Sequence, residues 1–379
     1  SSRFSRPLSE AHMKHPHRKK PKYIPLLAIP GVVILAVLVY AAYVFLSYYR
    51  LEDRLALEVF PAANSTYESL SPAIPYRVAS YNIGFGAYSA DYTFFMDGGS
   101  ESRARSKESV YENIDGAITA LQAMDADFLL LQEVDIDGTR SHHINEAALV
   151  LKAMGEAYCG TFAQNYDSPY LFWPLLEPHG ANRSGQLTLS RYPIRSALRR
   201  SLPIEESLMK LVDLDRCYSV QRIPVEDGNE LVLYNFHLSA YTSDGTIAEE
   251  QLKMLFADML AEYQKGNYAV AGGDFNKDLL GDSSAVFGIS GAAYTWAQPI
   301  PEELVPDGLS VVAPLDSGHP VPSCRNADRP YGPDDFVLVV DGFIVSDNVT
   351  VVDSTAVDTA FQWSDHNPVY LDFILQSDG

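Results

Sequence analysis

The sequence YAVAGGDFN at residues 268–276 is an apolar run that ends in polar residues able to bind a metal ion or a phosphate. Glycine has no side chain, so Gly272 and Gly273 allow another group to approach the backbone closely. Asp274 and Asn276 have the two-residue spacing that lets both face one side of a strand. Asp-x-Asn also occurs in calcium-binding loops, but the rest of that pattern is missing from this sequence. The run therefore predicts a strand whose end carries a functional site.

Further apolar runs end in, or contain, polar residues of the same kind. These residues are Asn82 in SYN, Glu133 in LLLQE, His237 in NFHL, Asp341 in VLVVDGFIVS, and Asp365 and His366 in SDHNP. Taken singly, each has an ordinary explanation: an Asn in a turn, a solvated Glu at a strand end, or a satisfied core histidine. A carboxylate inside an apolar run is costly unless it is paired. Asp341 could therefore pair with His366 and orient it, as a carboxylate orients a catalytic imidazole.

Strand and helix patterns alternate from residue 76 to the end of the chain. Residues 107–124 and 144–155 have helical patterns, and a further helix is predicted to begin at Thr246. Two strand patterns flank Asp227-Gly228-Asn229, which indicates a hairpin turn. Hairpins mixed with strand–helix crossovers predict a mixed sheet system with helices packed outside it.

The motifs SYN, QE, NFHL, GDFN, VDGFIVS and SDHNPV follow one another in this order along the chain. In this order they resemble the endonuclease/exonuclease/phosphatase superfamily, and the resemblance covers about residues 76–375. SDH and GDFN are the most specific of the motifs, and LSRYPI at 189–194 also matches. The resemblance implies an α/β fold, a four-layer α/β/β/α sandwich with two packed mixed β-sheets. With the apolar segment described below, the chain is expected to be a bacterial, membrane-anchored member.

The same resemblance implies a role for each motif residue. Glu133 would bind a divalent metal, with Asn82 and Asp365 near it; the metal is expected to be Mg²⁺, with Mn²⁺ as the alternative. Asp274 would position or deprotonate the attacking water, and Asn276 would hold a phosphate oxygen. His237 and His366 would stabilise charge on the phosphorus, with Asp341 orienting His366. The identity of the general base stays open at this point.

Two loops offer substrate contacts. The loop after Glu133 contains Arg140 and His143, for which a purely structural role is an equal alternative. The loop at 322–335 contains Arg325, a residue type that clamps phosphates.

Residues 24–49 contain no charged residue, and lysines and arginines crowd their N-terminal side. The segment is long enough to cross a bilayer, and positive flanks stay in the cytoplasm. We therefore expect a basic cytoplasmic tail at 1–22 (of which 1–12 look vector-derived), a transmembrane signal anchor at 23–49, a connector at 50–75 and an extracytoplasmic catalytic domain at 76–379. A signal peptide and a buried core helix are the alternatives.

The net charge of −21 limits the partners of this protein. An acidic body repels polyanions at long range, so nucleic acid is disfavoured as a substrate. The three cysteines form no C-x-x-C pair, which argues against structural zinc. No protein partner is indicated. We expect a metal-dependent phosphoesterase acting on a small or lipid-linked phosphodiester or phosphomonoester. An extracellular nuclease is the alternative, and a non-catalytic phosphate-binding module is the third hypothesis.

Overall fold

The computed structural model describes residues 24–62, 67–240, 246–289 and 296–376. The chain divides into two compact units, Ser1–Ser47 and Tyr48–Gly379. In the described part of the first unit, helix α1 (Ile24–Ser47) contains the apolar segment Ile29–Ser47, with a mean hydropathy of 2.5. Only 6% of this segment is buried inside the protein, unlike the core helix of a soluble domain. An N-terminal apolar helix of membrane-spanning length is therefore present.

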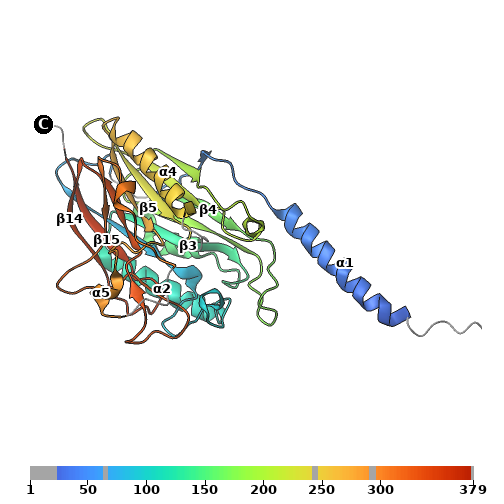
Figure 1. The fold of residues 1–379 in the computed structure, drawn as a ribbon. Helices are drawn as coiled ribbons and strands as arrows, with labels where there is room; N and C mark the ends of the chain where they lie inside the picture. Colours follow the sequence, from blue (N-terminus) through green and yellow to red (C-terminus); the bar gives the residue numbers. More distant parts are fainter. Residues whose placement is uncertain (1–23, 63–66, 241–245, 290–295, 377–379) are drawn as a thin grey trace, which may run out of the picture. The chain divides into compact units, whose positions relative to one another are not determined.

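The described part of the second unit contains two large mixed sheets (Figure 1). The seven-stranded sheet has, in spatial order, β1 (Leu55–Ala56), β6 (Ser196–Ser201), β7 (Cys217–Pro224), β8 (Glu230–His237), β9 (Tyr268–Asp274), β13 (Asp341–Ser346) and β10 (Leu309–Val312). The six-stranded sheet has β14 (Val349–Ala356), β15 (Val369–Leu375), β2 (Pro75–Asn82), β3 (Phe128–Gly138), β5 (Asn182–Ser190) and β4 (Cys159–Asp167). Strands β11 (Cys324–Arg325) and β12 (Val337–Leu338) form a separate ribbon.

Helices cover the outer faces of the two sheets (Figure 1). The α-helices of this unit are α2 (Lys107–Met124), α3 (Glu146–Met154), α4 (Thr246–Tyr263) and α5 (Ser283–Phe287). The 3-10 helices are η1 (Gly84–Gly86), η2 (Phe95–Asp97), η3 (Gly155–Ala157), η4 (Leu208–Leu211) and η5 (Glu302–Leu304).

Three apolar layers hold this arrangement together. Ile114 and Leu121 of α2 pack with Leu129 of β3 on one side. Between the sheets, residues such as Phe128, Leu233 and Phe373 share one cluster. On the other side, α4 packs through Leu252, Leu255, Phe256 and Met259 against the seven-stranded sheet. Apolar area removed from water on both faces of each sheet fixes the α/β/β/α order, and the two mixed sheets confirm that part of the predicted fold class.

Parallel strand pairs bring the motif residues to one edge of the sandwich. Strands β2 and β3 are parallel, with Asn82 opposite Gln132. Strands β8 and β9 are also parallel, with His237 opposite Asp274. Asp341 at the start of the antiparallel strand β13 is the register partner of Asp274. We call the end of the two sheets that carries these residues the catalytic edge.

Some local structure differs from the sequence pattern. The apolar run around Asp341 forms two strands, β12 and β13, instead of one. Asp341 is the first residue of β13. Strand β14 has no clear apolar alternation and was not predicted; Val352 on it is 55% exposed. Residues 50–75, which the sequence predicts to be a connector, contribute β1, which pairs with β6.

Gly273→Ala tests the packing of β9. A Cβ at this position would collide with the carbonyl oxygen of Phe236 on the neighbouring strand β8. We expect a loss of about 1–3 kcal/mol in the free energy of unfolding, the usual cost of overpacking, measured by urea denaturation. Gly332→Ala is the control, since the nearest atom would lie 3.8 Å away. Equal stabilities of the two variants would contradict this account of the glycine.

Candidate active site

The catalytic edge brings together side chains from both sheets. Asn82 and Glu133 come from β2 and β3 of the six-stranded sheet, whereas His237, Asp274 and Asp341 come from the seven-stranded sheet. Asp365 and His366 lie in the loop before β15. The structure therefore gathers into one site residues that are separated by as many as 284 positions in the sequence.

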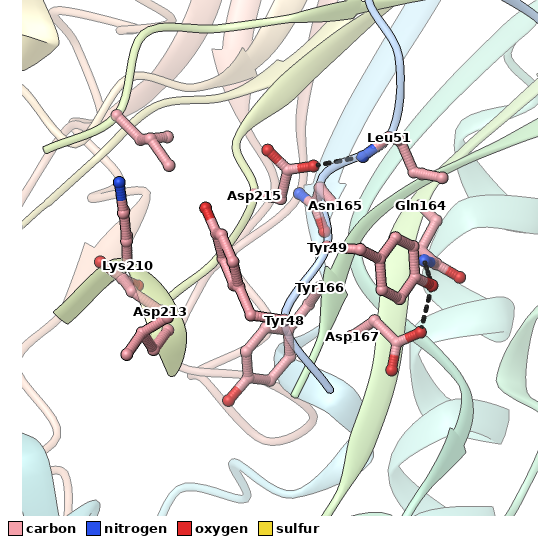
Figure 2. Close-up of a pocket in the computed structure, with 12 residues that line it drawn as sticks. Tyr48, Tyr49, Leu51, Gln164, Asn165, Tyr166, Asp167, Lys210, Asp213 and Asp215 are labelled. Carbon is pink, nitrogen blue, oxygen red and sulfur yellow. Dashed lines mark hydrogen bonds between the residues drawn. The ribbon is translucent and has the colours of Figure 1, made fainter. Parts of the chain in front are cut away.

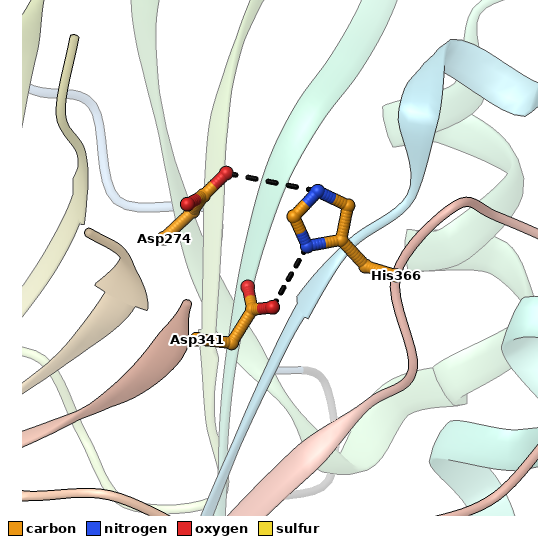
Figure 3. Close-up of side chains that lie close together, drawn as sticks. All are labelled: Asp274, Asp341 and His366. Atoms are coloured by element: carbon orange, nitrogen blue, oxygen red, sulfur yellow. Dashed lines mark hydrogen bonds and ion pairs between the residues drawn. The ribbon is translucent and has the colours of Figure 1, made fainter. Parts of the chain in front are cut away.

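Asp274, His366 and Asp341 form the centre of the site (Figure 3). His366 Nδ1 lies 2.7 Å from Asp341 Oδ2, and His366 Nε2 lies 3.8 Å from Asp274 Oδ2. All three residues are at least 95% buried. The Ser323 hydroxyl oxygen accepts the Asp341 backbone N–H at 3.0 Å, which fixes the strand start that carries this carboxylate. The imidazole of His366 is thus held between two carboxylates.

The two histidines of the site have opposite charge preferences. Burial disfavours the charged form of His366, but the adjacent Asp341 carboxylate raises the pKa of this imidazole well above its ordinary value. Burial lowers the pKa of His237 well below its ordinary value, and the nearby Arg216 guanidinium lowers it further. At neutral pH the site therefore holds an imidazolium at 366 and a neutral imidazole at 237.

Two carboxyl groups of the site, Asp274 and Asp365, have raised pKa values. Burial raises the pKa of Asp274 to about 7, against the opposing effect of His366. Burial likewise raises the pKa of Asp365 to about 6, and the Glu133 carboxylate adds to the rise. Each buried carboxylate therefore favours a proton or a cation beside it.

Asn82 links the two sheets through its side-chain amide. Its Nδ2 donates to Glu133 Oε1 at 3.1 Å and to Asp274 Oδ2 at 3.2 Å. Its Oδ1 accepts the backbone N–H of Gly84 at 3.0 Å, which fixes the orientation of the amide. The amide therefore sets the distance between the Glu133 and Asp274 carboxylates.

Strained backbone lies at the same place. Glu133 and Asn276 have positive φ values of 54° and 50°, a conformation that non-glycine residues rarely adopt. Glu133 sits in an irregularity of the β3–β5 pairing between Leu131 and Val134. Strain of this kind concentrates at functional sites, where surrounding structure maintains it.

The donor set suits a hard divalent cation. Asp274, Asp341 and His366 each offer a ligand atom, and these atoms lie within 4.8 Å of one another. His366 Nδ1 is already bonded to Asp341, however, which leaves oxygen atoms as the main donors. Oxygen donors favour Mg²⁺ or Mn²⁺. A bound cation would stabilise the charged form of these buried carboxylates and so lower their raised pKa values. Glu133 and Asp365, which carry the predicted metal site, lie beside this cluster.

The predicted substrate residues have structural contacts. Arg140 is buried and forms a bidentate pair with Asp135, at 3.1 and 2.7 Å. The Arg325 guanidinium is 1% exposed and donates to backbone carbonyls, including those of Ser89 and Tyr92. His143 is exposed and lies 2.7 Å from Asp137. These contacts hold the loops around the site, and substrate contact by these residues remains a prediction.

Arg216 is a cation of the site that the sequence motifs do not reveal. It is 7% exposed, and its NH1 lies 3.5 Å from the His237 carbonyl oxygen. Its Nε is buried and finds no hydrogen-bond partner among the described residues. A lone arginine before a strand is not a recognisable motif, so only the fold places this charge beside His237.

Comparison with known proteins defines the class. The sequence model of the Endonuclease/Exonuclease/phosphatase family matches residues 79–366. The chain belongs to this family, whose name joins nucleases and phosphatases. No curated protein matches the chain.

Several solved structures share the fold. An endonuclease/exonuclease/phosphatase from Beutenbergia cavernae DSM 12333 is 18% identical, with 80% of this chain and 72% of that chain covered and a TM-score of 0.53. ANGEL2, a 2',3'-cyclic phosphatase, is 18% identical over 80% of this chain and 96% of its own, with a TM-score of 0.54. A family protein from Leptotrichia buccalis C-1013-b is 15% identical over 79% and 99%, with a TM-score of 0.51. These likenesses show the fold alone.

Asp274→Asn tests the electrostatics of the site in the presence of a chelator. A carboxyl group whose folded-state pKa is raised to about 7 stabilises the fold at low pH, and this contribution is lost as pH rises from about 4 to about 7. The free energy of unfolding should therefore fall less across this window in Asp274→Asn than in the wild type, as measured by urea denaturation at several pH values. Asp115→Asn, at an exposed position on α2, should keep the wild-type profile. Identical profiles for all three proteins would refute the raised pKa of Asp274.

Proposed function

We propose that this protein is a membrane-tethered, magnesium-dependent phosphoesterase that hydrolyses a small or lipid-linked phosphate ester outside the cytoplasm. The observation that carries the proposal is the buried Asp274 carboxylate, which lies 3.4 Å from His237 Nε2 and 3.8 Å from His366 Nε2. In such an arrangement the carboxylate can activate a water molecule, and the two imidazoles can bind the anionic phosphate that the water attacks. Family membership supports the same reaction class.

A divalent cation fits the acidic side of the site. Glu133 would hold it, with Asp365 and the Asn82 side chain beside it. A bound Mg²⁺ offsets the charge of the phosphate and polarises the phosphorus–oxygen bond.

Asp274 would position or deprotonate the attacking water. A general base works best when its pKa is near the working pH, and the pKa of Asp274 is raised to about 7. The Asn276 backbone N–H donates to Asp274 Oδ1 at 2.8 Å, which orients the carboxylate and leaves Oδ2 toward the two histidines.

The two imidazoles would act on the phosphate from the other side. His366, charged and held by Asp341, would donate from Nε2 to a non-bridging or leaving oxygen as negative charge develops there. His237 would donate or accept according to its tautomer, and its Nδ1 finds no partner in the described part of the chain. The side chain of Asn276, whose Nδ2 now donates to the Leu238 carbonyl at 2.8 Å, is proposed to hold a further phosphate oxygen.

Arg216 extends this proposal. Its buried guanidinium beside His237 supplies a positive charge with a spare N–H. Such a group binds a phosphate oxygen more strongly than an exposed arginine, since water does not compete for it.

The net charge of the protein and its proposed membrane tether both favour a small or lipid-linked substrate. The net charge of −21 disfavours long polyanions, and helix α1 would hold the domain at a bilayer. The lysine-rich flank before α1 supports a cytoplasmic amino terminus and an extracytoplasmic domain. Hydrolysis of nucleic acid is the second candidate because the family includes nucleases by its name.

The test is hydrolysis by the full chain in detergent, with magnesium and with a chelator. The panel contains a chromogenic phosphodiester, sphingomyelin, an inositol phosphate, a 2',3'-cyclic nucleotide and plasmid DNA; the cyclic nucleotide is included because ANGEL2 is a 2',3'-cyclic phosphatase. We expect magnesium-dependent turnover of at least one small or lipid substrate. Preference for plasmid DNA would select the nuclease instead.

Asp274→Ala and His366→Ala test the assigned chemistry. Each should lower turnover by about 10²–10⁴-fold, the usual contribution of an acid or base. Asp115→Ala on the exposed face of α2 is the control and should keep the wild-type rate. Folding of each variant is checked by circular dichroism. A folded Asp274→Ala or His366→Ala protein with the wild-type rate would rule out this mechanism.

A further inference from the structure

Apolar side chains are exposed at the tip of the loop between β4 and β5. Trp173 is 65% exposed, Leu175 74% and Leu176 100%, and Phe172 beside them is 53% exposed. We call these four residues the apolar tip. Exposed clusters of large apolar residues mark surfaces that contact a partner or a membrane.

The base of this loop is held firmly, so the exposure of the tip is not that of a loose segment. The backbones of Leu171 and Gly180 exchange hydrogen bonds of 3.1 and 3.0 Å, and Ser168 N–H donates to the Asn182 carbonyl at 3.0 Å. His179 is buried, with its Nδ1 2.6 Å from the Ser102 carbonyl oxygen. The tip is therefore presented to solvent by a fixed stem.

The loop projects from the catalytic edge. Asp167 at the end of β4 and Asp137 near the end of β3 both pair with Arg183 of β5. Glu133 lies four residues before Asp137 on β3. The apolar tip and the proposed metal-binding carboxylate thus lie at the same end of the six-stranded sheet.

The chain that follows the apolar helix is attached at this same edge (Figure 2). Tyr49 donates its hydroxyl to Asp167 Oδ2 at 2.6 Å, one residue before the loop begins. Arg50 Nε donates to Asp215 Oδ1 at 2.7 Å. Leu51 N–H donates to Asp215 Oδ2 at 3.3 Å. Asp215 precedes Arg216, whose guanidinium approaches His237. The segment that would emerge from a bilayer is therefore tied to both sheets beside the site.

We propose that the apolar tip inserts into the surface of the lipid bilayer that holds helix α1, and that it keeps the catalytic edge against the lipid headgroups. The inference rests on the proposed membrane tether and narrows the substrate to a phosphate ester carried by a lipid. Leu208 of η4, in the segment that leads to Asp215, is a further exposed apolar residue, at 74%.

The chemistry of the surface fits a bilayer. Tryptophan and tyrosine favour the membrane–water interface, and leucine favours the acyl region below it. Tyr48, Tyr49 and Lys210 line a hollow next to the attachment point (Figure 2). The protein is acidic, with a net charge of −21, and anionic lipids repel it. Its contact with a bilayer must therefore depend on apolar side chains.

The first experiment measures tryptophan quenching in the full chain. The protein is reconstituted into phosphatidylcholine nanodiscs with and without phosphatidylcholine that carries a nitroxide near the headgroup. The sequence has three tryptophans, and Trp296 and Trp363 are packed in part against apolar clusters of the domain. We expect lipid-dependent quenching in the wild type, loss of most of it in Trp173→Phe, and retention in Trp363→Phe.

A second pair of variants separates the tip from other exposed apolar residues. Leu175→Asp/Leu176→Asp should reduce quenching of Trp173, because carboxylates do not enter the bilayer. Val352→Asp on β14, 55% exposed in the wild type, should not. The same tip variant should lower turnover of a lipid-borne phosphodiester by about tenfold, with turnover of the soluble chromogenic phosphodiester unchanged.

The outcomes separate this inference from the proposed function. Quenching that depends on Trp173, with no turnover of any probe, would support the docking surface and reject the phosphoesterase. Equal quenching in wild type and Trp173→Phe, or no quenching because a second copy of the chain covers the tip, would overturn the docking surface. A chain that does not co-elute with nanodiscs would remove the tether and this inference together.

Discussion

The site depends on the close packing of two sheets, which lets one amide reach carboxylates in both. Asn82 donates to Glu133 in its own sheet at 3.1 Å and to Asp274 in the other at 3.2 Å. Gly272 keeps the sheets close, because a Cβ there would lie 2.8 Å from Leu130 of the opposite sheet. Since neither sheet contains both carboxylates, the packing of the apolar layer between them determines the geometry of the chemistry.

Burial gives the residues at this junction their reactivity. Exclusion of water raises the pKa of Asp274 to about 7 and lowers the pKa of His237, so that a carboxyl group that titrates near neutral pH lies beside a neutral imidazole. His366 keeps its charge only because the Asp341 carboxylate lies 2.7 Å from it. The opposite protonation of the two histidines is therefore a property of their partners and not of the residue type.

Residues 49–51, which follow helix α1, are attached beside the candidate active site. Asp167 and Asp215 bind residues 49–51 at the catalytic edge of the two sheets. In the proposed membrane-tethered state, attachment at this edge would keep the proposed active site close to the tether.

The sequence by itself determined much of the order of elements, and it predicted the residues of the candidate site. Asn82, His237 and Asp274 lie at the ends of β2, β8 and β9, as the strand-end motifs predict, because burial of a strand imposes a pattern that its polar end interrupts. Glu133 instead lies within β3, and His366 lies in the loop before β15. The chemical role of each residue stays a prediction. The helix predicted at 107–124 has those same bounds in the structure. The sequence also predicts the apolar helix α1, because a long segment without charged residues can be recognised from local composition.

Only the tertiary structure decided the rest. Strand β14 lacks an apolar alternation because successive side chains on both of its faces are exposed or only half-buried, and Asp341 begins a strand where the apolar run appears continuous. Arg216 joins the site, and Arg325 turns inward to backbone carbonyls, through contacts between segments far apart in the chain. Strand pairing and pKa shifts depend on such contacts, and no local pattern of residues encodes them.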